Sequence, residues 1–131
     1  MILLSSDWGD NFVNGDGSVL EKSRPVISVQ DFSLSDIISF LQEKLAKRDI
    51  TSCFLFGSLA LNETTPWSDI DILIITETEK AFIERPLDYQ ELFDLGVSLD
   101  IIVYTPEEFE KVKMSASGFS LEMQKKMIQV L

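Results

Sequence analysis

The stretch FLFGSLALNETTPWSDIDILII, residues 54–75, decides the fold of this chain. Two apolar runs with strand character enclose a Gly-Ser pair, a polar loop and two aspartates that are separated by one residue. The second run begins with Asp69-Ile70-Asp71, although the burial of carboxylates is costly unless they gain partners. The stretch therefore predicts two strands. It also implies that some partner offsets the charge of the two aspartates.

The rest of the chain adds elements on both sides of this stretch. Apolar runs of β-branched and aromatic residues predict strands over residues 50–56, 70–76 and 97–105. Apolar periodicity and capping residues predict helices over residues 33–49, about 86–95, 106–114 and 120–131, the last capped by Ser120, and one helical turn begins at Ser58. Strands that alternate with helices predict an α/β layer structure with a mixed or parallel sheet.

The N-terminal part differs in composition. Residues 1–30 are rich in Gly, Asn, Asp and Ser without a sustained period, and are expected to be irregular, with a hairpin at Asn14-Gly15 and Asp16-Gly17 as one alternative and a loose leader as the other. Residues 31–131 are expected to form one domain.

The composition restricts the chemistry of the chain. A formal net charge of −11 argues against sequence-independent binding to nucleic acid. The absence of histidine excludes Ser-His-Asp catalysis and His-ligated zinc. Any metal ion must therefore have oxygen ligands, which suits Mg²⁺ or Mn²⁺.

Targeting signals are not evident. No apolar run has the length that spans a bilayer, and MILLSS is too short for the apolar region of a signal peptide. We therefore expect a cytoplasmic protein without membrane contact. The single cysteine, Cys53, fits a reducing compartment and is expected to be a buried core thiol.

Three aspartates can form one site. Asp69 and Asp71 have the spacing that places two side chains on one face of a strand, where they repel each other unless a cation lies between them. Asp100 opens another apolar run, and it faces the same side if the two strands pair. Three converging carboxylates could hold two Mg²⁺ ions, the arrangement used for phosphoryl or nucleotidyl transfer, although each aspartate alone is also typical of an ordinary strand start.

The Gly-Ser pair supplies a second part of the pattern. Gly57 gives the chain freedom to turn at the end of a strand, and the free N–H groups of the turn at Ser58 suit phosphate oxygens. Ten residues separate Ser58 from Asp69. The pattern G-S-x10-D-x-D between two strand-like runs is far more specific than any of its members.

These residues resemble a known family. FGSLALNETTPWSDIDILI followed by SLDIIVYTPEEFE is similar to the minimal nucleotidyltransferases of the DNA polymerase β superfamily, over about residues 50–131. The resemblance implies a small α/β (α+β) nucleotidyltransferase fold with a mixed sheet flanked by helices. It also implies that Gly57 and Ser58 hold ATP, that Asp69 and Asp71 bind the metal ions, and that Asp100 completes the catalytic triad of acids.

The resemblance also implies a partner and a reaction. Many such small proteins pair with a HEPN-domain toxin and resemble antitoxins that transfer AMP from ATP to a tyrosine of that toxin, so we expect a homo- or hetero-oligomer. Two alternatives remain: transfer to a small molecule, and an inert module that neutralises its partner by contact. The second is motivated by a departure, since family members usually read G-S-R-A-R-G where this chain has Leu59, Leu61 and Asn62.

Other side chains near the motif have open roles. Lys80 and Arg85 are the nearest basic residues after it, and each could replace the lost arginines or carry surface charge. Trp67 could stack on a base, mark a partner surface or lie half-buried in its loop.

Overall fold

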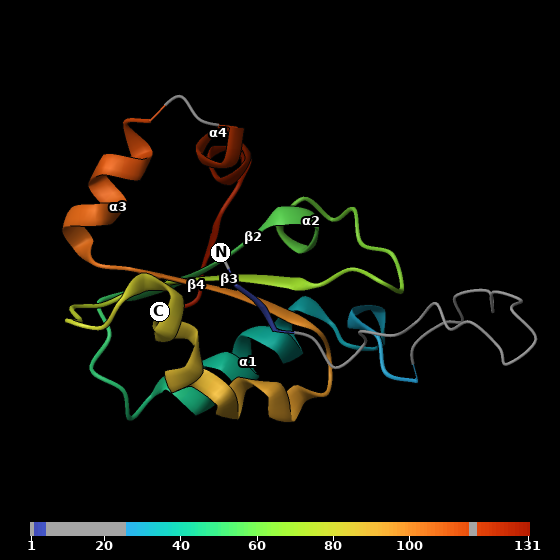
Figure 1. The fold of residues 1–131 in the computed structure, drawn as a ribbon. Helices are drawn as coiled ribbons and strands as arrows, with labels where there is room; N and C mark the ends of the chain where they lie inside the picture. The colour runs from blue at the N-terminus through green and yellow to red at the C-terminus, as the bar shows by residue number, and fades with distance from the viewer. Residues whose placement is uncertain (1, 5–25, 116–117) are drawn as a thin grey trace, which may run out of the picture.

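The computed structural model describes residues 2–4, 26–115 and 118–131 (Figure 1). Along the chain the elements are β1 (Ile2–Leu4), the 3-10 helix η1 (Val29–Asp31), α1 (Leu34–Leu45), β2 (Ser52–Phe56), α2 (Gly57–Ala60), β3 (Ile70–Ile75), the 3-10 helix η2 (Phe82–Leu95), β4 (Leu99–Tyr104), α3 (Pro106–Lys113), α4 (Gly118–Lys125) and β5 (Ile128–Gln129). In the described residues, no helix is both long and apolar enough to cross a bilayer.

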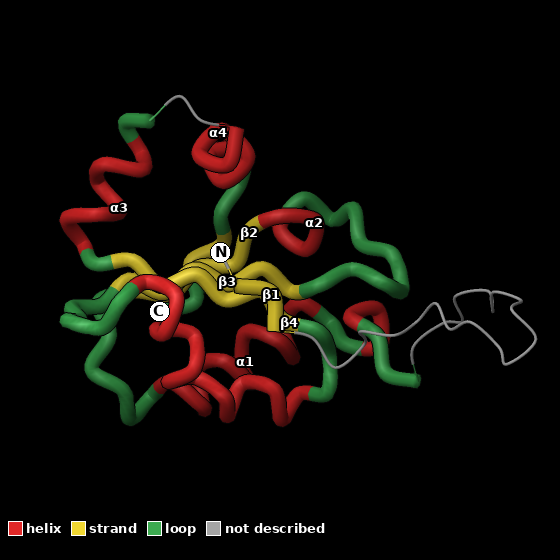
Figure 2. Tube along the Cα trace, viewed as in Figure 1, coloured by secondary structure: helices red, strands yellow, loops and turns green. Residues whose placement is uncertain are grey.

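Five strands form one mixed sheet in the order β1-β4-β3-β2-β5 (Figure 2). The central strands β3 and β4 are parallel, and every other neighbouring pair is antiparallel. Helices lie on both sides of the sheet in Figure 1, with α1 and η2 on one side and α3 and α4 on the other. The predicted fold class, a mixed sheet flanked by helices, is confirmed.

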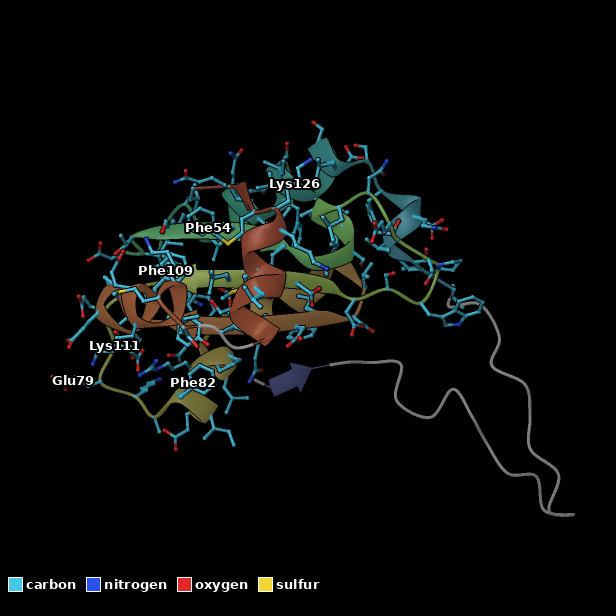
Figure 3. The ribbon with its side chains drawn as sticks, turned by 90° about the horizontal axis from the view of Figure 1, so that it is seen from above. Phe54, Glu79, Phe82, Phe109, Lys111 and Lys126 are labelled. Atoms are coloured by element: carbon cyan, nitrogen blue, oxygen red, sulfur yellow. The ribbon has the colours of Figure 1, made fainter. Side chains whose placement is uncertain are left out.

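The alternation of side chains along the strands creates two cores. Ile72 and Ile101 belong to the core that contains the buried residues of α1 and η2. Leu73 and Ile102 belong to the opposite core, which includes Phe109 of α3. The ring of Phe109 also contacts that of Phe54, with centroids 6.2 Å apart (Figure 3). By the same alternation, the side chains of odd-numbered β3 residues and even-numbered β4 residues lie on the α3–α4 side of the sheet.

Local capping explains two of the helix starts. Ser33 caps α1 through a hydrogen bond from the backbone N–H of Asp36, and the Asp36 carboxylate accepts one from the Ser33 backbone N–H. Thr105 and Glu108 form the equivalent arrangement at α3. Cys53 is fully buried, as predicted, and its burial raises the pKa of the thiol to about 12.

The C-terminal part differs from the sequence-based expectation. The predicted helix over residues 120–131 is wrong in both bounds, because α4 already begins at Gly118 and ends at Lys125. Ser120 is therefore not its N-cap; its hydroxyl donates a hydrogen bond of 2.7 Å to the carbonyl oxygen of Val112. The chain then forms β5 on the otherwise open edge of β2, which satisfies backbone groups that a helix would leave unpaired.

Two further elements were not expected in this form. The helix predicted near residue 86 begins at Phe82, is a 3-10 helix, and is interrupted at Tyr89, whose φ of −119° and ψ of 31° are not helical. The edge strand β1 lies in the segment expected to be irregular and pairs with β4. The turn dipeptides at residues 14–17 lie outside the described residues.

Candidate active site

Two of the predicted acids are direct neighbours in the sheet. Asp71 of β3 and Asp100 of β4 are paired in the parallel register, so their side chains project from the same face. Asp69 immediately precedes β3, two residues before Asp71, the spacing that places alternate side chains on one face. The fold thus places Asp71 and Asp100 side by side at the start of two adjacent, central strands, on the α3–α4 side, with Asp69 just before β3.

Asp100 is an unusual carboxylate. Its side chain is 5% exposed, and burial, followed by the negative charge of Asp69, raises its pKa from 3.8 to about 6. Its Oδ1 atom is the one buried side-chain oxygen or nitrogen in the described residues without a hydrogen-bond partner. A cation beside this oxygen would offset both the desolvation and the repulsion.

These observations can be compared with a divalent metal site. Carboxylate oxygens are the donors that Mg²⁺ and Mn²⁺ prefer, and the unpaired oxygen of Asp100 beside Asp71 fits such a role. Within the described ranges, however, no three acidic or cysteine side chains are gathered closely enough, as they stand, to ligate one ion. The assignment of Asp69, Asp71 and Asp100 as metal ligands therefore stays a prediction that the donor chemistry supports.

The Gly-Ser turn lies against these acids. Gly57 has a φ of +69°, and a Cβ atom placed on it would lie 2.0 Å from Oδ2 of Asp71. Phe56, the preceding residue, pairs with Asp71 across the β2–β3 ladder, which sets this approach. Ser58 follows on the half-buried first turn of α2. The sequence motif thus becomes one compact unit, although no ligand contact is shown for either residue.

In the sequence, Asn62 was notable only as a departure from the family pattern. The backbone conformation at this position explains why asparagine is found there. Its φ of +58° lies in the left-handed region, where glycine is favoured and asparagine is the best-tolerated alternative. The residue therefore preserves the backbone of the turn without the glycine that the pattern has at this position. Because asparagine tolerates a left-handed backbone, its presence in place of glycine was the sequence signal for this conformation.

The two leucines of the turn have different surroundings. Leu59 packs against the core on the α1 side, and Leu61 is half-buried without belonging to either core. The α2 turn consequently carries no basic side chain. The positive charge that the family pattern places beside the phosphates is absent at both positions.

The basic residues after the motif do not fill this gap. Lys80 forms a surface ion pair of 2.6 Å with Asp88, in agreement with a surface role. Arg85 fits neither sequence-based interpretation, since it is 7% exposed and donates hydrogen bonds to the Glu108 carboxylate and to the carbonyl oxygen of Val103. Val103 lies three residues beyond Asp100 on β4, about 10 Å along the strand.

Trp67 lies in a well-defined turn next to the aspartates. The Thr65 N–H donates to the Ser68 hydroxyl at 2.8 Å, and the Ser68 N–H donates to the Thr65 carbonyl oxygen at 3.1 Å. The Trp67 side chain is 40% exposed on this turn. Stacking on a base and contact with a partner both remain predictions for it.

One solved structure is similar to this chain in fold. The crystal structure of a toxin-antitoxin with AMP-PNP aligns with a TM-score of 0.53 and 18% identity, over 72% of this chain and 72% of that chain. At that identity, the likeness shows the fold alone. A crystal structure from Sulfolobus solfataricus, assigned as that of a nucleotidyltransferase, aligns with a TM-score of 0.45 and 21% identity, over 57% of this chain and 72% of that chain, too weakly to carry an argument.

The family assignment comes from the sequence profile. No curated protein matches the chain. The profile of the family described as "Nucleotidyltransferase domain" matches residues 34–127, well over half of the chain and a range that includes the Gly-Ser turn and all three aspartates. The chain therefore belongs to the nucleotidyltransferase domain family.

Proposed function

We propose that this protein is a Mg²⁺-dependent nucleotidyltransferase of the antitoxin type, which transfers AMP from ATP to a tyrosine of a HEPN-domain toxin. The observation that carries the proposal is the pairing of Asp71 with Asp100 beside the Gly57 turn, in a chain of the nucleotidyltransferase family. The partner class draws support from the toxin-antitoxin complex that shares the fold.

The proposed reaction is an in-line transfer. The tyrosine hydroxyl oxygen forms a bond to the α-phosphorus of ATP, and the bond from that phosphorus to the oxygen bridging it to the β-phosphorus breaks. Pyrophosphate leaves with that oxygen, and the tyrosine proton passes to a carboxylate or to water. A bound Mg²⁺ ion would neutralise the developing charge on the phosphates.

Each residue then has a defined task. Asp69, Asp71 and Asp100 would hold the metal ions, and Asp100 is the most buried of the three. The backbone of Gly57 and the hydroxyl and N–H of Ser58 would hold the phosphates. Mn²⁺ offers the same oxygen-ligand chemistry and is expected to substitute.

The test is a transfer assay with the product of the gene adjacent to that of this chain, which the proposal expects to be a HEPN-domain protein. We expect α-labelled ATP and Mg²⁺ to label a tyrosine of that protein, located by mass spectrometry. Asp69→Asn is expected to abolish labelling, whereas Asp94→Asn, which changes an exposed aspartate paired with Lys44, is expected to retain it. Absence of transfer by the wild type, with no difference between the variants, would refute the enzymatic function.

A contact-only antitoxin is the second candidate, and the lack of a basic side chain on the α2 turn favours it. The two functions differ in their dependence on the acids. A contact-only antitoxin carrying Asp100→Asn still neutralises its partner in a growth assay, whereas a transferase carrying it does not. Partner binding, measured separately, must persist in that variant for the comparison to hold.

A further inference from the structure

A cavity of about 330 Å³ lies beside α2 and is lined by neither the Gly-Ser pair nor any of the three aspartates. Three segments that are distant in sequence line it: the η1–α1 region, the α2 turn with the loop that follows it, and the stretch from Lys126 to the start of β5. Its apolar walls are formed mainly by Val29, Phe32, Leu34, Leu59 and Ile128. The cavity therefore shares no lining residue with the proposed catalytic set.

Among the described residues, one charged side chain lines this cavity. This residue is Lys126, an exposed residue that follows α4 directly. Figure 3 shows Lys126 beyond the end of α4. Because the remaining walls are apolar or neutral, the electrostatic preference of the cavity is for an anion.

The ammonium group of Lys126 is also available. Other described cations, such as Lys44, Lys80 and Lys113, form ion pairs with acidic side chains. For Lys126, no acidic side chain lies within ion-pair distance in the part of the chain that the structure describes. An incoming carboxylate would thus gain a charge-assisted hydrogen bond without displacing a partner from the described residues.

A hydrogen bond connects two of the segments that line the cavity. The Gln30 side-chain amide donates a hydrogen bond of 2.8 Å to the carbonyl oxygen of Thr64, joining η1 to the loop that follows α2. A polyphosphate would need several cationic or N–H donors, whereas these walls offer one ammonium group and mostly apolar surface. The ligand that fits these walls best has one negative charge and an apolar body.

We propose that this cavity binds a small amphiphilic monocarboxylate, with its carboxylate at Lys126 and its apolar body against Val29, Phe32 and Leu59. The proposal does not depend on the transfer reaction, since none of these residues belongs to the proposed catalytic set. The binding is expected to be weak for a small probe, because a ligand of about a dozen heavy atoms has a limited binding energy.

The experiment compares two probes of the same shape on the full chain. We expect 4-phenylbutyrate to cause saturable chemical-shift changes at the backbone amides of Leu59, Ala60 and Ile128 in an NMR titration. The neutral 4-phenylbutanamide is expected to bind about tenfold more weakly, since it lacks the charge-assisted interaction. Equal affinities of the two probes, or no saturable change at these amides, would overturn the proposal.

Variants locate the interaction. Lys126→Met keeps the length of the side chain and is expected to weaken 4-phenylbutyrate about tenfold while leaving the amide unchanged. Lys47→Met, at an exposed lysine outside the cavity, is expected to change neither affinity. If Lys126→Met leaves the preference for the carboxylate intact, the assignment of the charge is wrong.

A second variant tests the cavity itself. Thr64→Phe adds volume from a half-buried loop position that lines the cavity, and the hydrogen bond from Gln30 goes to the backbone of Thr64, which the substitution retains. Both probes are expected to lose saturable binding in this variant, with an unchanged thermal unfolding transition. Retention of wild-type affinity would show that the probes bind elsewhere and would also overturn the proposal.

Discussion

The Oδ2 atom of Asp71 occupies the space that a Cβ atom on residue 57 would fill, 2.0 Å from the ideal position of that atom. Gly57 also has a φ of +69°, which side chains of L-residues strongly disfavour. The glycine therefore serves two purposes at once: it turns the chain at the end of β2, and it admits a carboxylate against the backbone. The proposed phosphate-binding turn and a proposed metal ligand are thereby in direct contact.

Gly57→Ala is expected to damage both stability and activity. The Cβ atom would force the Asp71 carboxylate away, and the positive φ adds backbone strain, for a combined loss of about 2–3 kcal/mol in the free energy of unfolding. Urea denaturation measures the loss, and the AMP-transfer assay measures activity. We expect no detectable transfer at concentrations where the variant is still folded.

Gly96→Ala is the matched control for this prediction. Gly96 also has a positive φ, +84°, but its Cβ atom would meet only the end of the Ile27 side chain, at 3.2 Å. The variant is expected to lose about 1 kcal/mol and to retain transfer activity. Equal loss of activity in both variants would mean that the contact between residues 57 and 71 has no special role.

Asn62 allows a test of the turn backbone alone. Its φ of +58° is favourable for glycine and strained for alanine. Asn62→Gly is expected to leave the free energy of unfolding within about 0.5 kcal/mol of the wild type, whereas Asn62→Ala costs about 1 kcal/mol. Chemical denaturation of both variants decides the matter, and a stable alanine variant would argue against a conformational role.

The strands that carry the aspartates were predictable from the sequence, because an apolar run of β-branched residues has few other structures open to it. The register was not. That Asp71 pairs directly with Asp100 depends on how two strands separated by η2 align, and no local pattern encodes this. The Gly-Ser spacing identified the site, but only the structure shows that Gly57 and Asp71 are in contact.

Long-range partners explain the failures. Arg85 was expected at the surface or at the phosphates. It is instead buried, and it donates a hydrogen bond to Glu108, which lies 23 residues away in the sequence. The run around Ile128 was predicted to be part of a helix, but it forms a short strand that pairs with the open edge of β2. In both cases the tertiary neighbour, rather than the intrinsic propensity, determined the outcome.

The lost arginines can be restored one at a time. Leu61 is half-buried outside both cores, so Leu61→Arg is expected to keep the fold and to tighten ATP binding about fivefold by adding a cation beside the phosphates. Leu59→Arg is the contrasting variant, since Leu59 packs on the core and its loss is expected to cost about 2 kcal/mol of stability. Calorimetric titration with a non-hydrolysable ATP analogue measures the affinities. An unchanged affinity in a folded Leu61→Arg variant would contradict a phosphate site at this turn.

The ionisation of Glu108 is expected to make the stability of the protein depend on pH. Hydrogen bonds from the Arg85 side chain, and then from the Thr105 backbone, hold the pKa of this carboxyl below its usual value. Its contribution to stability is therefore present above the pKa of the unfolded chain and is lost as the pH falls through the lower pKa of the folded state. Since the side chain is partly exposed, solvent screening limits the effect of Glu108→Gln to about 1 kcal/mol at pH 7.

The measurement is the free energy of unfolding between pH 3 and pH 7. The difference between Glu108→Gln and the wild type is expected to shrink toward zero at the acidic end. Glu110→Gln, at an exposed position of the same helix, serves as the control and is expected to show no such trend. A difference that does not depend on pH would indicate lost packing rather than a lost charge.

Asp100→Asn is expected to stabilise the metal-free protein at neutral pH. Burial and the charge of Asp69 raise the pKa of Asp100 to about 6 in the folded state, above its ordinary value of 3.8. Between these values the folded state binds the proton more tightly than the unfolded chain, so that wild-type stability falls as the pH rises from about 4 to 6 and stays lower above that. The variant, which never ionises, is expected to gain about 1–2 kcal/mol at pH 7 and nothing at pH 4.

The melting temperature, measured first with EDTA and then with added Mg²⁺, tests whether a metal ion offsets the cost of burying the Asp100 carboxylate. Mg²⁺ is expected to raise the melting temperature of the wild type, since it binds the folded state selectively, and to have little effect on Asp100→Asn. Asp94→Asn, at an exposed position, controls for nonspecific charge effects and is expected to respond as the wild type does. Equal shifts in wild type and Asp100→Asn would show that the buried carboxylate with its unpaired oxygen does not contribute to a metal site.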